Sequence, residues 1–396
     1  MKKYKLSQLL EIKNGKDHKD LPDGQYPVLG SGGIMRYANK FLYDDESILL
    51  PRKGTLSNIQ YISEPFWTVD TLYYTIVDIS KVDVYYLYCY LSRLDLSNLN
   101  TGTGVPSMTF DTYYNIEVTL PSLETQKRIS NVLKSLANQI NNLNTINRNL
   151  EQVARQLYDY WFVQFDFPNH EGKPYKSSGG EMVWNESLNR FIPKIFERGT
   201  LNDYIGRITN GLNPRKNFTL GSGDNYYVTI RSLLGTDIDW DNCDRCDDDA
   251  LRKINSRSQL QVGDVIFSAI GTIGRTYYIQ EEPKNWNISE TSFTLRPKEN
   301  VPNDFFYSLL NCSEIQLQAD KNAMGSTLRC LVMESLCKIP YFVVPQIIME
   351  LFSAKVKPVY KSIYQNGVSI RHLQQLRDEL LPMLLNGQVN CDLSHS

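Results

Sequence analysis

The chain has 396 residues, more than one ordinary hydrophobic core accommodates, so we expect at least two domains. Apolar residues make up 41% and charged residues 22%, which is the composition of a folded globular protein rather than a disordered one. The 42 basic and 44 acidic residues give a net charge of −2, which excludes a nucleic-acid binder acting through bulk positive charge. It leaves open a binder whose positive charge is local.

No apolar run reaches the roughly 18 residues that a membrane span requires, and no apolar stretch follows the basic start at residues 1–5. The seven cysteines are odd in number and scattered, which favours a reducing compartment over a disulfide framework. We therefore expect a cytoplasmic protein with no membrane partner.

Common enzyme signatures are missing. The sequence has no phosphate-binding Gly-x-x-x-x-Gly-Lys-Ser/Thr motif, no dinucleotide-binding glycine motif and no histidines at metal-ligand spacing. Cys243 and Cys246 have Cys-x-x-Cys spacing, but no second pair accompanies them and the acidic run at 247–249 would not lower a thiol pKa. We interpret that segment as a solvated loop, and the glycine clusters at 30–33, 101–104 and 221–223 also as loops. No catalytic residue, metal or cofactor is expected in this chain.

In chain order, residues 1–121 and 197–344 predict the same elements twice. Each copy has a short capped helix ending at glycine, a buried strand running into a Gly-Thr turn, an aromatic-rich helix and a closing strand before proline. The matched segments are 6–15 with 201–211, 48–56 with 265–273, 84–91 with 302–309, and 116–121 with 339–345. The second copy is longer by an insertion before its Gly-Thr strand.

A long helix with a heptad seam follows each copy, over 122–164 and 345–388. Apolar residues recur at four-three spacing, which is typical of a coiled coil. The first seam is Ile129, Leu133, Leu136, Ile140, Leu143, Asn147, Leu150, Ala154, Leu157 and Trp161, and the second lies 223 residues later, from Phe352 to Leu384. Pro358 predicts a kink or a late start of the second helix. Two core helices, each packed on its own domain, are the alternative.

An antiparallel pairing of the two seams would place Asn147 opposite Asn366, so that the two amides can satisfy each other. The alternative is that each amide points to solvent at a kink, which Gly367 would favour in the second helix. The first seam covers 33 residues and would form a rod of about 50 Å.

Residues 165–196 are rich in Gly, Pro, Ser and Asn and are predicted to form an extended linker, and residues 389–396 form a tail. The first copy carries 12 basic and 14 acidic residues, and the second carries 16 and 19. Neither copy is basic overall, so net charge does not indicate nucleic-acid binding.

Several segments carry a resemblance. LPSLETQKRI (120–129) opens the first helix, LRDELLP (376–382) closes the second, and GKPYKSSGG (172–180) lies between the copies. Within the copies stand LLPRKGT (49–55), FWTVDT (66–71) and GDVIFSAIGTIGR (263–275). Together these segments resemble the specificity subunits of type I restriction-modification systems, over nearly the whole chain.

The resemblance implies an α+β fold: two similar mixed α/β target-recognition domains separated by two long helices in an antiparallel coiled coil, as a pseudo-two-fold internal repeat. It implies a non-catalytic subunit that binds double-stranded DNA and docks two methyltransferase subunits, and restriction subunits in the full complex. S-adenosylmethionine and ATP with magnesium would belong to those partners. The adenine-methylase tetrapeptide is absent, which disfavours a methyltransferase with its own recognition domain.

Two domains on one rod would read two different half-sites separated by an unread gap. Base and phosphate contacts require cationic and hydroxyl side chains on exposed turns. The candidates are Arg36, Lys40, Arg52, Lys53 and Thr55 in the first copy, and Arg215, Lys216, Arg231, Ser268, Thr272, Arg275 and Arg329 in the second. The two Gly-Thr turns themselves favour a shared scaffold, because different half-sites need different readers.

Two other classes of function stay open from sequence alone. One is a self-contained DNA methyltransferase or nuclease, which the missing motifs disfavour. The other is a coiled-coil scaffold that binds protein and not DNA, which the acidic totals of both copies permit.

Overall fold

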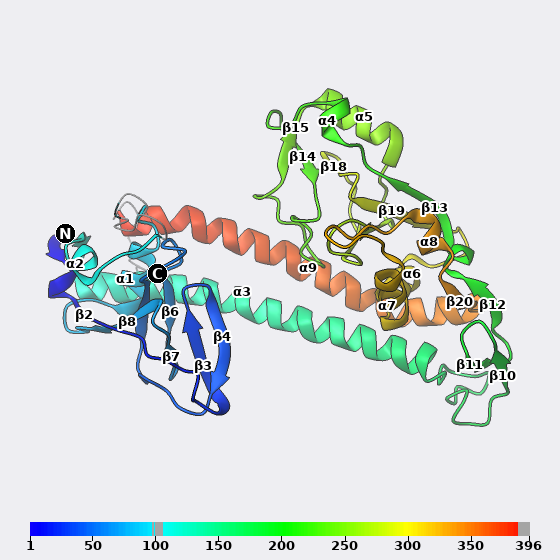
Figure 1. The fold of residues 1–396 in the computed structure, drawn as a ribbon, viewed down its shortest axis with the longest axis horizontal. Coiled ribbons are helices and arrows are strands. Elements are labelled where there is room, and N and C mark those ends of the chain that lie inside the picture. The colour runs from blue at the N-terminus through cyan, green and yellow to red at the C-terminus, as the bar shows by residue number, and fades with distance from the viewer. Residues whose placement is uncertain (97–98, 100–105, 387–396) are drawn as a thin grey trace, which may run out of the picture. The chain divides into compact units, whose positions relative to one another are not determined.

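The computed structural model describes residues 1–96, 99 and 106–386 (Figure 1). The chain divides into two compact units, Met1–Asn141 with His372–Ser396, and Asn142–Arg371, so each long helix contributes to both. The predicted loop at 101–104, the tail at 389–396 and the last two residues of the predicted second helix lie outside the described residues. Among those described, no helix is both long and apolar enough to cross a membrane.

The first unit contains a mixed set of short strands and helices. Its elements are β1 (Lys2–Lys5), β2 (Leu10–Lys13), β3 (Asp23–Gly30), β4 (Gly33–Ala38), β5 (Ser47–Pro51), β6 (Gln60–Ile62), β7 (Trp67–Thr68), β8 (Leu72–Val77), α1 (Val84–Leu91), α2 (Phe110–Tyr114), β9 (Glu117–Leu120) and the start of α3 (Leu123–Tyr158). The described strands pair in the orders β2-β8-β5-β6, β4-β3-β7 and β1-β9.

The second unit opens with the end of α3 and a π-helical turn at Asp159–Val163. Its further elements are β10 (Met182–Asn185), β11 (Arg190–Pro193), β12 (Glu197–Thr200), β13 (Ile205–Asn210), α4 (Pro214–Asn217), β14 (Asn225–Val228), β15 (Asp244–Cys246), α5 (Asp248–Ser258), β16 (Val265–Ser268), β17 (Thr276–Tyr278), β18 (Trp286–Ile288), β19 (Ser292–Pro297), α6 (Asn303–Asn311), α7 (Ser313–Asn322), α8 (Met333–Cys337), β20 (Pro340–Val343) and α9 (Gln346–Leu385), which continues into the first unit. The described strands pair in the orders β13-β19-β16-β17, β15-β14-β18, β12-β20 and β10-β11.

The predicted internal repeat is confirmed by the strand pairing. The sheet β2-β8-β5-β6 has the same order and antiparallel pairing as β13-β19-β16-β17. In the smaller sheets, β3 pairs in parallel with β7, and β14 pairs in parallel with β18. The aromatic-rich helices α1 and α6 occupy equivalent places in the chain order, and the insertion adds α4 and α5 to the second copy.

One strand in each copy is buried on both faces. In β5, Ile48 and Leu50 pack in the main core beside α1 and α3, while Leu49 packs with the smaller sheet. In β16, Val265 and Phe267 lie in the main core, while Ile266 joins a separate cluster with Val228 and Ile288. Because side chains alternate along a strand, an uninterrupted apolar run fits a sheet covered on both sides.

The predicted capped helix at the start of each copy is wrong. The helical part is a 3-10 turn, at Leu6–Gln8 in the first copy and Leu201–Asp203 in the second, and a strand follows each turn. In β2 the buried residues Leu10 and Ile12 alternate with polar residues. This two-residue period is typical of a half-buried strand, and the segment forms a strand instead of a helix.

The interpretation of 165–196 as an extended linker is also wrong. The segment contains the hairpin β10–β11, and Phe165, Phe167, Ile192 and Phe196 are buried in the core of the second unit. The large aromatic side chains outweigh the Gly- and Pro-rich composition, because each buries a large apolar area.

Both long helices are present. Ser122 caps α3, with its Oγ accepting from the backbone N–H of Thr125 at 3.2 Å. The second helix α9 begins at Gln346, so the late start near Pro358 is wrong. Pro358 has no N–H to donate within the helix, and burial of Val356, Tyr360 and Ile363 on either side of it offsets the lost hydrogen bond.

In the second unit, α3 and α9 lie side by side and run antiparallel (Figure 1). The Nδ2 of Asn366 donates to the Oδ1 of Asn147 at 2.8 Å, which confirms the predicted amide pair. The Nδ2 of Asn147 donates in turn to the carbonyl oxygen of Ile363 at 3.3 Å. The same register brings Trp161 to Phe352, with ring centroids 5.6 Å apart.

We expect Asn147→Leu to lower the free energy of unfolding by about 1–3 kcal/mol, because it leaves the half-buried Asn366 amide without its acceptor. The double change Asn147→Leu with Asn366→Leu should be more stable than the wild type, since it removes both polar groups from the seam. Urea unfolding of all four proteins in a double-mutant cycle measures both effects. A single change without cost would show that the amides do not depend on each other.

Gly15 and Gly211 occupy equivalent places after β2 and β13, and both touch backbone. A Cβ would lie 2.0 Å from the carbonyl oxygen of Val69 at Gly15, and 1.8 Å from that of Ile288 at Gly211. We expect Gly15→Ala and Gly211→Ala each to destabilise their copy by about 1–3 kcal/mol through overpacking against backbone. Calorimetry is the measurement, and Gly32→Ala is the control because nothing lies within 4 Å of its Cβ position.

Candidate nucleic-acid interface

The Gly-Thr turn of the second copy is held from inside by Ser268. Its hydroxyl donates to the carbonyl oxygen of Thr272 at 2.6 Å and accepts from the backbone N–H of Arg275 at 2.8 Å. Ser268 has no exposed surface, so it supports the turn and offers no group to a ligand. Thr272 and Arg275 are exposed beside it.

Other predicted contact residues gather around this turn. The Nη1 of Arg275 donates to the carbonyl oxygens of Ile230 and Leu233, both at 3.3 Å, so Arg275 lies against the loop that carries the exposed Arg231. The carbonyl oxygen of Arg329 accepts from the N–H of Gly271 at 2.8 Å. The guanidinium of Arg329 is paired with Asp320 at 2.5 Å, which neutralises much of its charge.

The turn also borders α3 of the same unit. A cleft of about 420 Å³ is lined by Gly274, Arg275 and Thr276 of the turn and by Glu151 and Arg155 of α3. Burial raises the pKa of the Glu151 carboxyl. This part of the turn therefore faces a helix, as expected for scaffold.

In the first copy, Arg52, Lys53 and Thr55 lie together on the turn after β5. The Nη1 of Arg52 donates to the carbonyl oxygen of Asp70 at 3.2 Å, while Lys53 and Thr55 are exposed. The hairpin turn between β3 and β4 lies beside them, because a Cβ on Gly54 would be 3.2 Å from the Oγ of Ser31.

Arg36 and Lys40 lie away from that turn. Arg36 stands on β4, and its Nη2 pairs with Asp23 at 2.6 Å, so it braces the hairpin. Lys40 is exposed after β4. The exposed face of β4 carries apolar side chains instead, with Ile34, Met35 and Tyr37 between 50% and 59% exposed.

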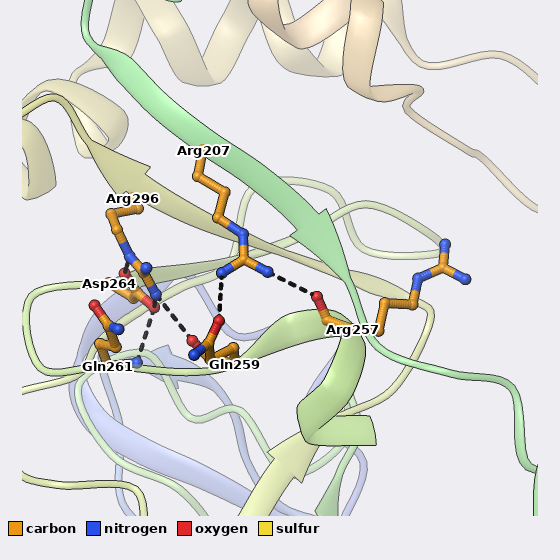
Figure 2. Close-up of polar contacts among 6 residues, drawn as sticks. All are labelled: Arg207, Arg257, Gln259, Gln261, Asp264 and Arg296. Carbon is orange, nitrogen blue, oxygen red and sulfur yellow. Dashed lines mark hydrogen bonds and ion pairs between the residues drawn. The ribbon is translucent and has the colours of Figure 1, made fainter. Parts of the chain in front are cut away.

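Arg215 and Lys216 are exposed on α4, beside α5. Figure 2 shows the other end of α5, where Arg207 of β13 donates to Gln259 Oε1 at 3.1 Å and to the carbonyl oxygen of Arg257 at 3.0 Å. The guanidinium of Arg257 points away from these contacts.

A buried carboxylate anchors the same region. Asp264 is 1% exposed and receives two bonds from Arg296, Nε to Oδ1 at 2.7 Å and Nη2 to Oδ2 at 2.9 Å (Figure 2). Arg296 also donates to the carbonyl oxygen of Gln259 at 2.9 Å, which ties β19 to the end of α5.

Sequence reasoning missed Arg207, Lys253 and Arg257. Arg207 lies far from the other two in the chain, Lys253 and Arg257 lie about one helical turn apart, and no turn motif marks any of them. The available signal was the amphipathic helix at 248–258, whose second half is basic.

The interpretation of the Cys-x-x-Cys segment as a solvated loop is wrong. Asp244–Cys246 forms strand β15, and Cys246 is fully buried. Burial raises the pKa of both the Cys243 and the Cys246 thiol. In the part of the chain that the structure describes, no three His, Cys, Asp or Glu side chains come together as a metal site.

Residues 1–152 match the family model described as the Type I restriction modification DNA specificity domain. The chain is 23% identical over 389 residues to the type I restriction enzyme MjaIX specificity subunit of Methanocaldococcus jannaschii, covering 94% of this chain and 86% of that protein. It is 22% identical to the HindI specificity subunit of Haemophilus influenzae, covering 74% and 73% of the two chains. The crystal structure of a type I restriction-modification S subunit from M. genitalium has the same fold, with a TM-score of 0.61 over 97% of this chain and 95% of that one, at 17% identity.

The repeated domains and the paired helices give this chain the fold of a solved S subunit, and its residues 1–152 match a DNA specificity domain. The chain is similar to the specificity subunits of type I restriction-modification systems over most of its length, as the sequence motifs indicated.

The role of the Gly-Thr turn can be measured at Ser268. We expect Ser268→Ala to destabilise the second unit by about 1–3 kcal/mol, because it removes the partner of two part-buried backbone groups, the carbonyl of Thr272 and the N–H of Arg275. Thr272→Ala, at an exposed position on the same turn, should leave the unfolding transition unchanged. Thermal unfolding of both variants is the measurement, and equal stabilities would show that the Ser268 hydroxyl does not hold the turn.

Proposed function

We propose that the chain reads a bipartite, asymmetric DNA site, with one half-site recognised by each globular copy. The observation that carries the proposal is that the two copies share one strand topology but carry different side chains at equivalent exposed places. The β4 face of the first copy is apolar and the Lys53 turn is basic, whereas the second copy adds α4 and α5 with their cations. One framework with two surfaces suits two different half-sites.

The paired helices support a fixed gap between the half-sites. A polar pair within an apolar seam selects one register, and the Asn147–Asn366 bond provides it in the second unit. In this function the helices act as a spacer and as the place where two methyltransferase subunits dock. The direct base contacts would come from exposed turns and not from the buried Ser268.

The chain itself would perform no chemistry in this function. S-adenosylmethionine would be held by the methyltransferase partners, and ATP with magnesium by restriction subunits in a full complex. The complex would act in the cytoplasm, where its DNA substrate lies. The proposal thus treats this chain as the part that selects the site at which the partners act.

The proposal predicts the methylation pattern of a host that expresses this chain with its partner methyltransferase. Methylome sequencing should find one bipartite motif, with methylated adenine in both halves and an unread gap between them. Exchanging residues 1–121 for the matching domain of another specificity subunit should change one half of the motif only, since each copy has its own core and sheets.

The control is the same exchange with residues 197–344, which should change the other half. No motif from a folded wild-type complex would leave a protein-binding scaffold as the better function. DNA methylation by the purified chain alone would instead favour a self-contained enzyme.

A further inference from the structure

Positive charge collects at one place on the second copy, although that copy is acidic overall. The α5 basic patch consists of Arg207 on β13, Arg215 and Lys216 on α4, and Lys253 and Arg257 on α5. Four of these side chains are exposed and that of Arg207 is half-buried. Residues 197–344 carry 16 basic and 19 acidic side chains, so the patch is a positive region on a copy whose net charge is negative.

Hydrogen bonds between the elements hold the patch together. The Nζ of Lys253 donates to the carbonyl oxygen of Asn217 at 3.1 Å, which joins α5 to the helix carrying Arg215 and Lys216. The Nη2 of Arg257 donates to the Oδ1 of Asn210 at 2.6 Å, which joins α5 to β13. The cations of three elements thus lie around one helix.

Three of the cations, Arg207, Lys253 and Arg257, are positioned by neutral acceptors. Arg207 bonds a side-chain amide and a backbone carbonyl, Arg257 bonds an amide, and Lys253 bonds a carbonyl. Over residues 1–96, 99 and 106–386, none of the five forms an ion pair with a carboxylate. In the described part of the chain, the charges of these five side chains are therefore not neutralised by carboxylates.

The nearby acids are already engaged. Asp247 caps the first turn of α5 at Ala250, Asp249 pairs with Arg252, and Asp264 pairs with Arg296. The acids of α5 thus stand in its first turn, whereas Arg257 stands in its last.

We infer that the α5 basic patch binds the phosphate backbone of the DNA beside the second half-site. The inference rests on the proposed function and adds to it the surface that holds the duplex. Lysine and arginine on phosphates position a protein on DNA without reading its bases. The patch would therefore contribute affinity on any sequence and leave the choice of half-site to other residues.

The test is the triple change Arg215→Gln, Lys216→Gln and Arg257→Gln in the complex with the partner methyltransferase. Arg207 is left in place because it also holds the end of α5. Binding is measured over a range of salt concentrations to a duplex carrying the methylated motif and to a scrambled duplex of the same length. The matched control is Lys298→Gln, Lys321→Gln and Lys338→Gln, three exposed cations elsewhere in residues 197–344.

We expect the patch variant to bind both duplexes more weakly at low salt by similar factors. Its plot of log affinity against log salt should be shallower by about 1 for each phosphate that is no longer neutralised, up to about 3. The methylated motif should stay the same. The control variant should keep the wild-type slope, because it removes the same charge from other places.

An unchanged slope in the patch variant, or an equal loss in the control, would overturn the inference while leaving the proposed function in place. A change of motif would also overturn it, since the patch would then read bases. Loss of methyltransferase assembly with normal DNA binding would assign the patch to a protein partner instead. A wild-type complex that binds neither duplex would overturn the proposed function and this inference together.

Discussion

The hydrogen bond between the Asn147 and Asn366 amides fixes the register of α3 and α9 in the second unit. The rest of the seam there is apolar and would accept other alignments at modest cost, because apolar side chains pack without directional partners. Shifting one helix by a turn would bury both amides against hydrocarbon. With the amides paired, Trp161 meets Phe352 and the core of the globular copy closes over the same helices.

A common framework and a divergent surface coexist in this chain because they depend on different side chains. The framework is set by strands buried on both faces, such as β5 and β16, and by glycines that touch backbone. The side chains of β5 and β16 are buried, and Gly211 is buried with them. Exposed positions on β4, α4 and α5 carry little of the core, so their side chains can differ between the copies without loss of the framework.

Much of the fold followed from the sequence because repetition and heptad spacing are strong signals. The seam alignment even gave the Asn147–Asn366 pair. The helix predicted at the start of each copy was wrong. In the first copy Leu6, Leu9 and Leu10 have helical spacing, but Leu10 and Ile12 are both buried at the two-residue spacing of a strand, and a strand forms. Contact residues were harder to predict. Ser268 is chemically suited to a phosphate but is buried, and the α5 basic patch joins residues far apart in the chain through pairing that no local motif records.

The charges of α5 are arranged along its axis, with Asp248 and Asp249 in the first turn and Arg257 in the last. This order complements the helix dipole, and each such charge stabilises the helix by roughly 0.3–1 kcal/mol. Arg257 therefore has a second interaction, with the negative end of the dipole of its own helix. An anion that binds beside Arg257 competes with that end of the helix for the same guanidinium group. Part of the free energy gained by binding the anion is then offset, because Arg257 stabilises the dipole of α5 less strongly. The stability of α5 is thereby linked to anion binding on the α5 basic patch.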